Sequence, residues 1–171
     1  MTYGQAEMRI AGLVQDSIVD GPGLRFVLFA QGCDKRCGGC HNPDTWDMSG
    51  GEEMSVADII EEMSRNQLTD GLTLSGGEPL LQAAECAEIA AAAQSKGLNV
   101  WLYTGSVFEE LIMKASEDRA VEYLLDNTDV LVDGPYIADE KTLQLKWRGS
   151  RNQRVLDMRK SLEVGLAVEL E

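Results

Sequence analysis

Short runs of aliphatic, β-branched and aromatic residues recur along the chain and predict buried strands. They cover residues 24–29, 72–74, 100–103 and 130–132. Each run is short enough for a strand that is covered on both faces, and each is followed by a glycine, at which the backbone can turn sharply. The pattern therefore predicts four buried strands, each ending in a turn.

Helical patterns occupy the segments between these runs. Apolar residues in the segment 56–63 fall at i, i+3, i+4 and i+7, and Ser55 is placed as the N-cap. Residues 83–95 are alanine-rich and stop before a Lys-Gly pair, and residues 108–115 and 120–125 resemble further helices. The tail after Ser161 shows no clear pattern. Strand and helix thus alternate, which predicts an α/β fold of mostly parallel strands.

The chain length limits the size of this fold. A complete eight-unit barrel needs about 250 residues, whereas the chain has 171. We therefore expect a single domain, residues 1–171, built as a partial (β/α) barrel. Right-handed crossovers place every strand-to-helix loop at the same edge of a parallel sheet. The cysteine-rich loop after residue 29, the loop 75–79, Thr104-Gly105 and Asp133-Gly134 are thus expected to face one site.

Composition and charge narrow the class of partner. Hydrophobic residues make up 44% of the chain, which suits one domain with its own core. The formal net charge of −14 argues against nucleic acid or an anionic membrane as the main partner. The N-terminus lacks an apolar signal core, and no stretch approaches the roughly 18 apolar residues of a membrane span. A cytoplasmic protein is expected.

The most informative chemistry lies in a CxxxCxxC triplet formed by Cys33, Cys37 and Cys40. Three thiolates can hold three corners of a cubane 4Fe-4S cluster and leave one iron open, whereas structural zinc prefers four protein ligands. The crowding of three cysteines into eight residues favours metal binding over disulfides. Cys86 shares helical spacing with Ile89, which indicates a buried thiol rather than a ligand.

A different class of protein is also compatible with these cysteines. The triplet together with His41 or Cys86 could hold structural zinc in a non-catalytic interaction module with an acidic surface. That interpretation leaves the Gly76-Gly77-Glu78 loop without a role. His41 directly follows Cys40, and adjacent residues seldom reach one tetrahedral metal without straining the backbone, so a hydrogen-bonding or structural role suits it better.

Several motifs together resemble a known family. The triplet and the glycine loop resemble the radical S-adenosylmethionine (SAM) superfamily, and residues 21–25, 31–33, 41–42 and 45–46 are similar to those of its glycyl-radical activating enzymes. Residues 129–134, 147–150 and 152–153 resemble the group that serves anaerobic ribonucleoside-triphosphate reductases more than the activases of pyruvate formate-lyase. The resemblance covers roughly residues 15–158.

This resemblance implies a reaction and its cofactors. It implies that the three cysteines bind a 4Fe-4S cluster with one open iron, and that SAM is reductively cleaved there to generate a glycyl radical on anaerobic ribonucleoside-triphosphate reductase. The expected electron donor is of the flavodoxin type. The alternative within this class is an activase of pyruvate formate-lyase or of another glycyl radical enzyme. Positioning residues, rather than an acid–base pair, are expected because the cofactors carry the chemistry.

The resemblance also implies which residues contact SAM. Gly76, Gly77 and Glu78 would receive the methionyl ammonium group. Gly39, Cys40 and His41 would place main-chain groups beside the cofactor, although many radical SAM enzymes carry an aromatic residue where Gly39 stands. Thr104 and Asp133 are further candidates. A bulky residue in place of Gly77 is expected to weaken SAM binding and to leave the iron content intact.

Overall fold

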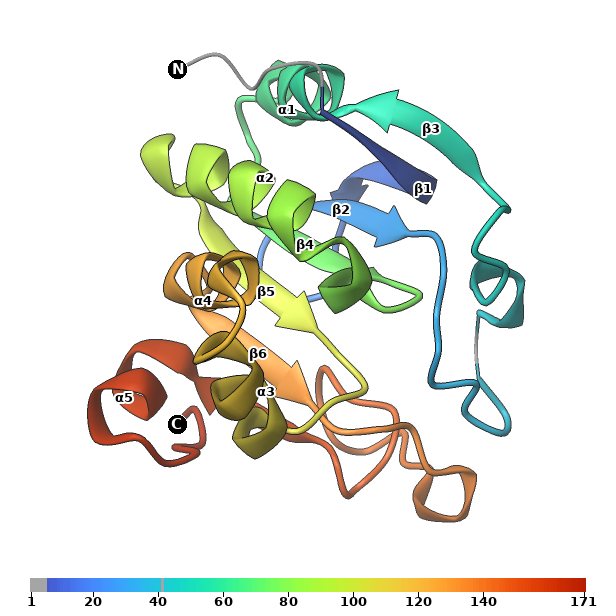
Figure 1. Ribbon diagram of the computed structural model, residues 1–171, viewed down its shortest axis with the longest axis vertical. Helices are drawn as coiled ribbons and strands as arrows, with labels where there is room; N and C mark the ends of the chain where they lie inside the picture. Colours follow the sequence, from blue (N-terminus) through green and yellow to red (C-terminus); the bar gives the residue numbers. More distant parts are fainter. Residues whose placement is uncertain (1–5, 41) are drawn as a thin grey trace.

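A seven-stranded sheet carries the fold in the computed structural model, which describes residues 6–40 and 42–171 (Figure 1). The strands are β1 (Glu7–Ser17), β2 (Arg25–Ala30), β3 (Glu52–Ser55), β4 (Gly71–Gly76), β5 (Asn99–Tyr103), β6 (Val130–Asp133) and β7 (Arg154–Asp157). The helices are α1 (Val56–Arg65), α2 (Ala83–Ser95), α3 (Phe108–Ala115), α4 (Arg119–Asp126) and α5 (Met158–Val164). Three short 3-10 helices are η1 (Pro43–Thr45), η2 (Pro79–Gln82) and η3 (Ala138–Glu140).

The strand order is β3-β1-β2-β4-β5-β6-β7. The four central strands, β2, β4, β5 and β6, run parallel, as the sequence predicts. The pairs β1–β2, β1–β3 and β6–β7 are antiparallel, so the expectation of a mostly parallel sheet holds for the centre and is wrong for the flanks. Figure 1 shows the arrowheads of the central strands pointing toward one edge of the sheet, where the long loops gather.

The alternation of side chains along the strands separates two faces. One face packs against the helices and forms the main core, with Phe26, Leu72 and Leu102 fully buried. The opposite face carries a smaller cluster made of Trp101, Val130, Val132 and Val155. Because both faces of the central strands are covered, the sequences of these strands are continuous apolar runs.

The helices α1 to α4 lie where the sequence predicts them, whereas α5 was not predicted, because it reaches into the tail after Ser161 that shows no clear pattern. Ser55 caps α1 by accepting a hydrogen bond from the backbone N–H of Asp58 at 3.0 Å, and the periodic apolar residues of this helix are buried. The bounds of α2 and α3 agree with the predicted ranges, and α4 extends one residue beyond its range at each end. In the described part of the chain, no helix is both long and apolar enough to cross a membrane.

A fully buried arginine closes the amino-terminal end of the sheet. The Arg25 guanidinium donates hydrogen bonds to Thr73 Oγ1 at 2.8 Å, Asn99 Oδ1 at 2.7 Å and the Leu72 carbonyl at 2.7 Å. Burial lowers its pKa to about 10, which leaves it charged at neutral pH. Arg25 lies at the opposite end of β2 from the cysteine loop, so its role here is to hold neighbouring strands in register.

Candidate functional site

The cysteine loop after β2 is fixed at both ends by hydrogen bonds. The Gly32 N–H donates to the Thr45 carbonyl at 2.7 Å, and the Cys33 N–H donates to the Trp46 carbonyl at 3.4 Å. The side-chain amide of Gln31 donates to two carbonyls of the segment 44–47, at 3.0 and 2.8 Å. The loop therefore leaves the sheet and returns to it at the same place.

The glycine loop after β4 lies directly against the cysteine loop. The Gly77 N–H donates to the Ala30 carbonyl at 2.9 Å, and the Glu78 N–H donates to the Gly32 carbonyl at 2.8 Å. A Cβ at Gly77 would overlap the Gly32 carbonyl oxygen and lie 3.0 Å from that of Thr45. We expected a bulky residue at Gly77 to affect SAM binding alone. The structure gives another reason for an effect, because such a side chain would first collide with the backbone of Gly32, which precedes Cys33.

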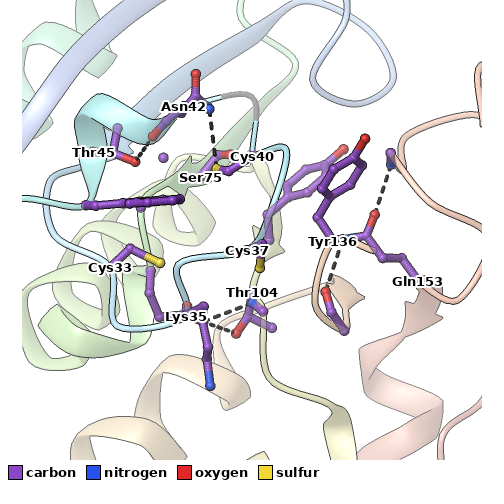
Figure 2. A pocket seen from close by; sticks show the side chains of 18 residues that line it. Cys33, Lys35, Cys37, Cys40, Asn42, Thr45, Ser75, Thr104, Tyr136 and Gln153 are labelled. Atoms are coloured by element: carbon purple, nitrogen blue, oxygen red, sulfur yellow. Dashed lines mark hydrogen bonds between the residues drawn. The ribbon is translucent and has the colours of Figure 1, made fainter. Parts of the chain in front are cut away.

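These loops line one pocket at the carboxyl edge of the parallel strands (Figure 2). The predicted convergence of the four strand-to-helix loops is thus confirmed. The lining residues are Cys33, Lys35, Cys37, Cys40, Asn42, Thr45, Trp46, Ser75, Gly76, Gly77, Glu78, Tyr103, Thr104, Gly105, Gly134, Tyr136, Gly149 and Gln153.

The three thiols of the triplet form the donor set of this pocket. Cys33 is buried, whereas Cys37 and Cys40 are partly exposed, and burial raises the pKa of the Cys33 thiol. Among the described residues, no three His, Cys, Asp or Glu side chains are placed to hold a single metal ion. A cubane cluster does not need that arrangement, because each thiolate would bind a different iron atom.

A second observation also suits a sulfur-rich group. The Nε1–H of Trp46 is buried and has no hydrogen-bond partner within the described structure, although the residue lines the pocket. Buried donors are normally paired, and sulfurs of iron–sulfur clusters accept hydrogen bonds that tune their potential. The residues present therefore fit a 4Fe-4S cluster.

Glu78 connects the glycine loop to the loop after β5. Its carboxylate is buried, and Oε1 accepts hydrogen bonds from Thr104 Oγ1 at 2.8 Å and from the Gly105 N–H at 2.9 Å. The other oxygen accepts from the Leu80 N–H at 3.3 Å. Burial raises the pKa of Glu78, and these hydrogen bonds oppose that shift. The carboxylate thus positions two loops in addition to lining the pocket.

The remaining predicted cofactor residues lie around the third cysteine. The Cys40 N–H donates to the Cys37 carbonyl at 3.1 Å, and the Asn42 N–H points at Cys40 Sγ at 3.4 Å. Gly39 is exposed and adopts a φ of 74°, which favours glycine. His41 falls outside the described residues.

Cys86 lies away from this pocket. It is fully buried in the main core on α2, where burial raises its pKa. The structure therefore does not bring Cys86 to the triplet, and the zinc site that uses it as the fourth ligand is not formed. Its position agrees with the expectation of a packed core thiol.

Asp133 serves the framework rather than the pocket. Its fully buried carboxylate accepts hydrogen bonds from the Phe108 N–H at 2.7 Å and from Arg154 Nε at 3.0 Å. Arg154 also pairs with the exposed Glu109 at 2.8 Å. Asp133 therefore fixes the start of α3 next to the edge strand β7.

The motif at residues 147–153 builds one side of the pocket. Trp147 packs edge-to-face on Trp101, with 5.8 Å between ring centroids. Gln153 Oε1 accepts from the Gly149 N–H at 2.9 Å, and its Nε2 donates to the Gly134 carbonyl at 3.0 Å. The sequence identified this motif only by its resemblance to a family and did not predict that it lines the pocket.

Lys35 and Tyr136 are lining residues that the sequence analysis missed. Lys35 lies between two of the predicted cysteine ligands, and Tyr136 comes three residues after the predicted strand-end residue Asp133. Both positions are therefore carried to the same edge of the sheet as the triplet. Proximity to predicted strand ends was the signal that could have identified them.

Comparisons with known proteins agree with this geometry. A family model described as "4Fe-4S single cluster domain" matches residues 19–156. The chain is 36% identical to the anaerobic ribonucleoside-triphosphate reductase-activating protein of Vibrio cholerae, over 80% of this chain and 89% of that protein. It is likewise 36% identical to the protein of that name from Escherichia coli, over 83% and 94% of the two chains. The pyruvate formate-lyase 1-activating enzyme of Escherichia coli is also 36% identical, over 90% of this chain and 62% of that enzyme.

Proposed function

Since the chain belongs to the 4Fe-4S single cluster family that the family model defines, together with the anaerobic ribonucleoside-triphosphate reductase-activating proteins, we propose that it is a radical SAM activase of such a reductase. The observation that carries this proposal is the joining of the triplet and the Gly76-Gly77 loop in one pocket. A zinc-binding module would use the cysteine triplet but would leave the Gly76-Gly77 loop without a role. The partial barrel, which we expect from the chain length and from the alternation of strands and helices, remains a prediction.

In this proposal Cys33, Cys37 and Cys40 hold three irons of the cluster. When bound, the reduced cluster and SAM together supply the electron and the hydrogen abstraction that yield methionine, 5′-deoxyadenosine and a glycyl radical on the partner. The chain itself would orient the methionyl end at Gly76 and Gly77, which both line the pocket. The buried carboxylate of Glu78 would favour the ammonium group nearby.

The test of this proposal is low-temperature electron paramagnetic resonance of the reconstituted, reduced protein with and without SAM. A cluster signal that changes on adding SAM is the expected result. A colourless protein that holds one zinc per chain would refute it. Production of 5′-deoxyadenosine under reducing conditions provides a second, chemical readout.

One observation supports a second candidate within the same class. The pyruvate formate-lyase 1-activating enzyme is as similar in identity as the reductase-activating proteins. Residues 147–153, which resemble the reductase group, build part of the pocket and favour the reductase as partner. Anaerobic incubation with each purified partner would decide, because only the true partner should acquire the glycyl radical signal. A flavodoxin-type protein is the electron donor that we would supply first.

A further inference from the structure

A loop beside the pocket differs from the rest of the molecule in its charge. Residues 141–151, here called the basic loop, hold four of the 15 Lys and Arg residues and no Asp or Glu, in a chain with a net charge of −14. Asp139 and Glu140 precede the loop, which still leaves residues 137–151 with two more cations than acids. A local basic surface on an acidic protein steers an acidic partner to that place.

The cations of the basic loop are available to a partner. Arg154 and Arg159, which follow the loop, pair with carboxylates of this chain. Lys141, Lys146 and Arg151 are exposed, and within the described part of the chain no carboxylate pairs with them. Their charge is therefore not neutralised by this protein.

The base of the basic loop is fixed to the body of the protein. The Thr142 N–H donates to the Gly149 carbonyl at 3.0 Å, so the two ends of the loop pair as in a hairpin. Trp147 packs edge-to-face on Trp101 of β5. Because the base is ordered in advance, a partner that docks on the loop need not supply the free energy to order it.

The outer part of the basic loop carries apolar side chains into solvent. Leu143 is 90% exposed, and Leu145 is exposed as well. Ile137 is a third exposed apolar residue, and its N–H donates to Ser150 Oγ at the base of the loop. Single exposed apolar residues are common, but several that share one loop with unpaired cations form a surface that suits protein binding.

The basic loop is continuous with the wall of the pocket. Gly149 and Gln153 line the pocket. A Cβ at Gly39 in the cysteine loop would lie 3.4 Å from the Cβ of Ala138, which precedes the basic loop. Figure 1 shows the loops that follow β6 at the edge of the sheet toward which the central strands point. A protein docked on the basic loop would therefore reach the mouth of the pocket.

We propose that the basic loop docks an acidic surface of the glycine-bearing partner, next to the glycine that receives the radical. This inference rests on the proposed function, because it requires a protein whose glycine enters this pocket. Hydrogen abstraction needs that glycine at the reacting centre, so the partner must cover the pocket mouth that the loop borders. An electron donor need not enter the pocket, and the position of the loop therefore favours the glycine-bearing protein.

The test measures partner binding and SAM cleavage separately. Reconstituted full-length protein is reduced with dithionite, so that no protein donor takes part, and its affinity for the purified anaerobic reductase is measured. Leu143→Ala should weaken the complex by about 5- to 50-fold, because about three buried carbon atoms lose their contact. Lys146→Glu should weaken it by about 3- to 10-fold at low ionic strength and by less in high salt, because exposed charges are screened.

Two variants far from the basic loop are matched controls. Leu166→Ala removes an exposed leucine after α5, and Lys160→Glu reverses the charge of an exposed lysine in α5. α5 begins where β7 ends, at the opposite edge of the sheet, because β7 is antiparallel to β6. Both controls should bind the reductase like the wild type. All four variants should keep the iron content and the rate of 5′-deoxyadenosine formation measured without the reductase.

The outcomes separate this inference from the proposed function. If the wild type places no glycyl radical on the reductase, the proposed function fails and the inference fails with it. If the wild type activates the reductase and the loop variants bind it with unchanged affinity, only the inference is overturned. Loop variants that lose SAM cleavage without the reductase would also overturn it, since the loop would then act on the pocket itself. Loop variants that slow only the reduction by a flavodoxin-type protein would overturn it and assign the loop to the electron donor.

A second measurement needs no variant. The wild-type complex with the reductase is treated with a carbodiimide, which joins an ammonium group to a carboxylate in direct contact, and the linked peptides are identified by mass spectrometry. Links from Lys141 or Lys146 to acidic residues of the reductase are expected, and high salt should suppress them. Links confined to lysines outside the basic loop would overturn the assignment even if the loop variants failed to fold.

Discussion

Gly77→Ala tests whether the glycine loop and the cysteine loop depend on each other. The backbone at Gly77 is not in the left-handed region, so alanine can adopt it and the effect comes from contact alone. The added methyl group would overlap the Gly32 carbonyl oxygen. That oxygen cannot move freely, because it accepts the Glu78 N–H at 2.8 Å.

The expected size follows from these contacts. Overpacking costs about 1–3 kcal/mol, and loss of the hydrogen bond to the Gly32 carbonyl costs about 1 kcal/mol more. Alanine also reduces the conformational entropy of the unfolded chain, which stabilises the folded state by about 0.4–1 kcal/mol. The net loss in the free energy of unfolding is therefore about 1–3 kcal/mol. For a chain of this size, the melting temperature should fall by about 3–10 °C. Because Cys33 follows Gly32, iron loading should fall as well.

Gly38→Ala, in the cysteine loop, is the matched control. A Cβ there meets no atom within 4 Å and needs no unusual backbone angle, yet the variant carries the same entropic term. The two variants should therefore differ by about 2–4 kcal/mol in urea unfolding of the iron-free proteins, and only Gly77→Ala should lose iron after reconstitution. Equal stability and equal iron content of the two variants would refute the steric reasoning.

Three further predictions address other parts of the molecule. Alanine at any cysteine of the triplet should abolish cluster assembly, seen as loss of iron and visible absorbance, whereas Cys86→Ala should keep both and cost about 1–2 kcal/mol of stability; iron retained in a triplet variant would contradict the assignment. Glu78→Gln should cost about 1–3 kcal/mol in urea unfolding. Both carboxylate oxygens of Glu78 accept hydrogen bonds, so the NH₂ group of glutamine would replace one acceptor with a donor that faces another donor. Asp133→Asn should cost about 1–3 kcal/mol, because it weakens the hydrogen bonds of a fully buried carboxylate to a partly exposed guanidinium. Glu109→Gln, at the exposed end of Arg154, should cost less than about 1 kcal/mol. The hydrogen bond from Arg154 lowers the pKa of Glu109. The stability that this contact contributes is therefore fully present at pH values above the ordinary pKa of a glutamate, and it is lost as the pH falls through the lowered pKa. Wild-type protein should show this step in stability, and Glu109→Gln should lack it.

The sequence predicted the elements whose local pattern and packing agree. The four central strands are buried on both faces, so their apolar runs were unbroken, and α2 lies against them with an alanine-rich face. The flanking strands were missed because they lack such runs. β1 contains Gly12 and two register shifts, and β7 has four residues, of which two are buried. The edge strands β3 and β7 have only four residues each, and such short strands carry a weaker signal in the sequence.

The candidate site was predictable where chemistry depends on spacing. The triplet and the glycine loop can be recognised from their residue types and spacing, and the alternation of strands and helices brings them to one edge of the sheet. Tyr136 and Lys35 carry no spacing rule, and their place in the pocket depends on the path of long loops. The dual role of Glu78 could not be deduced either, because its partners Thr104 and Gly105 lie more than twenty residues away.

The arrangement separates the stability of the fold from binding at the site, except in the Gly76-Gly77-Glu78 loop. The main core packs between the sheet and its helices, and among its buried residues none belongs to the triplet. Removal of iron should therefore leave the fold in place, unlike a zinc finger whose metal supplies its folding energy. The contact of Gly77 with Gly32 is one place where stability and binding are coupled, because the backbone at the edge of the sheet also positions Cys33. A change at this contact should disturb both properties together, whereas a change at the core thiol Cys86 should lower stability and leave binding at the site unchanged.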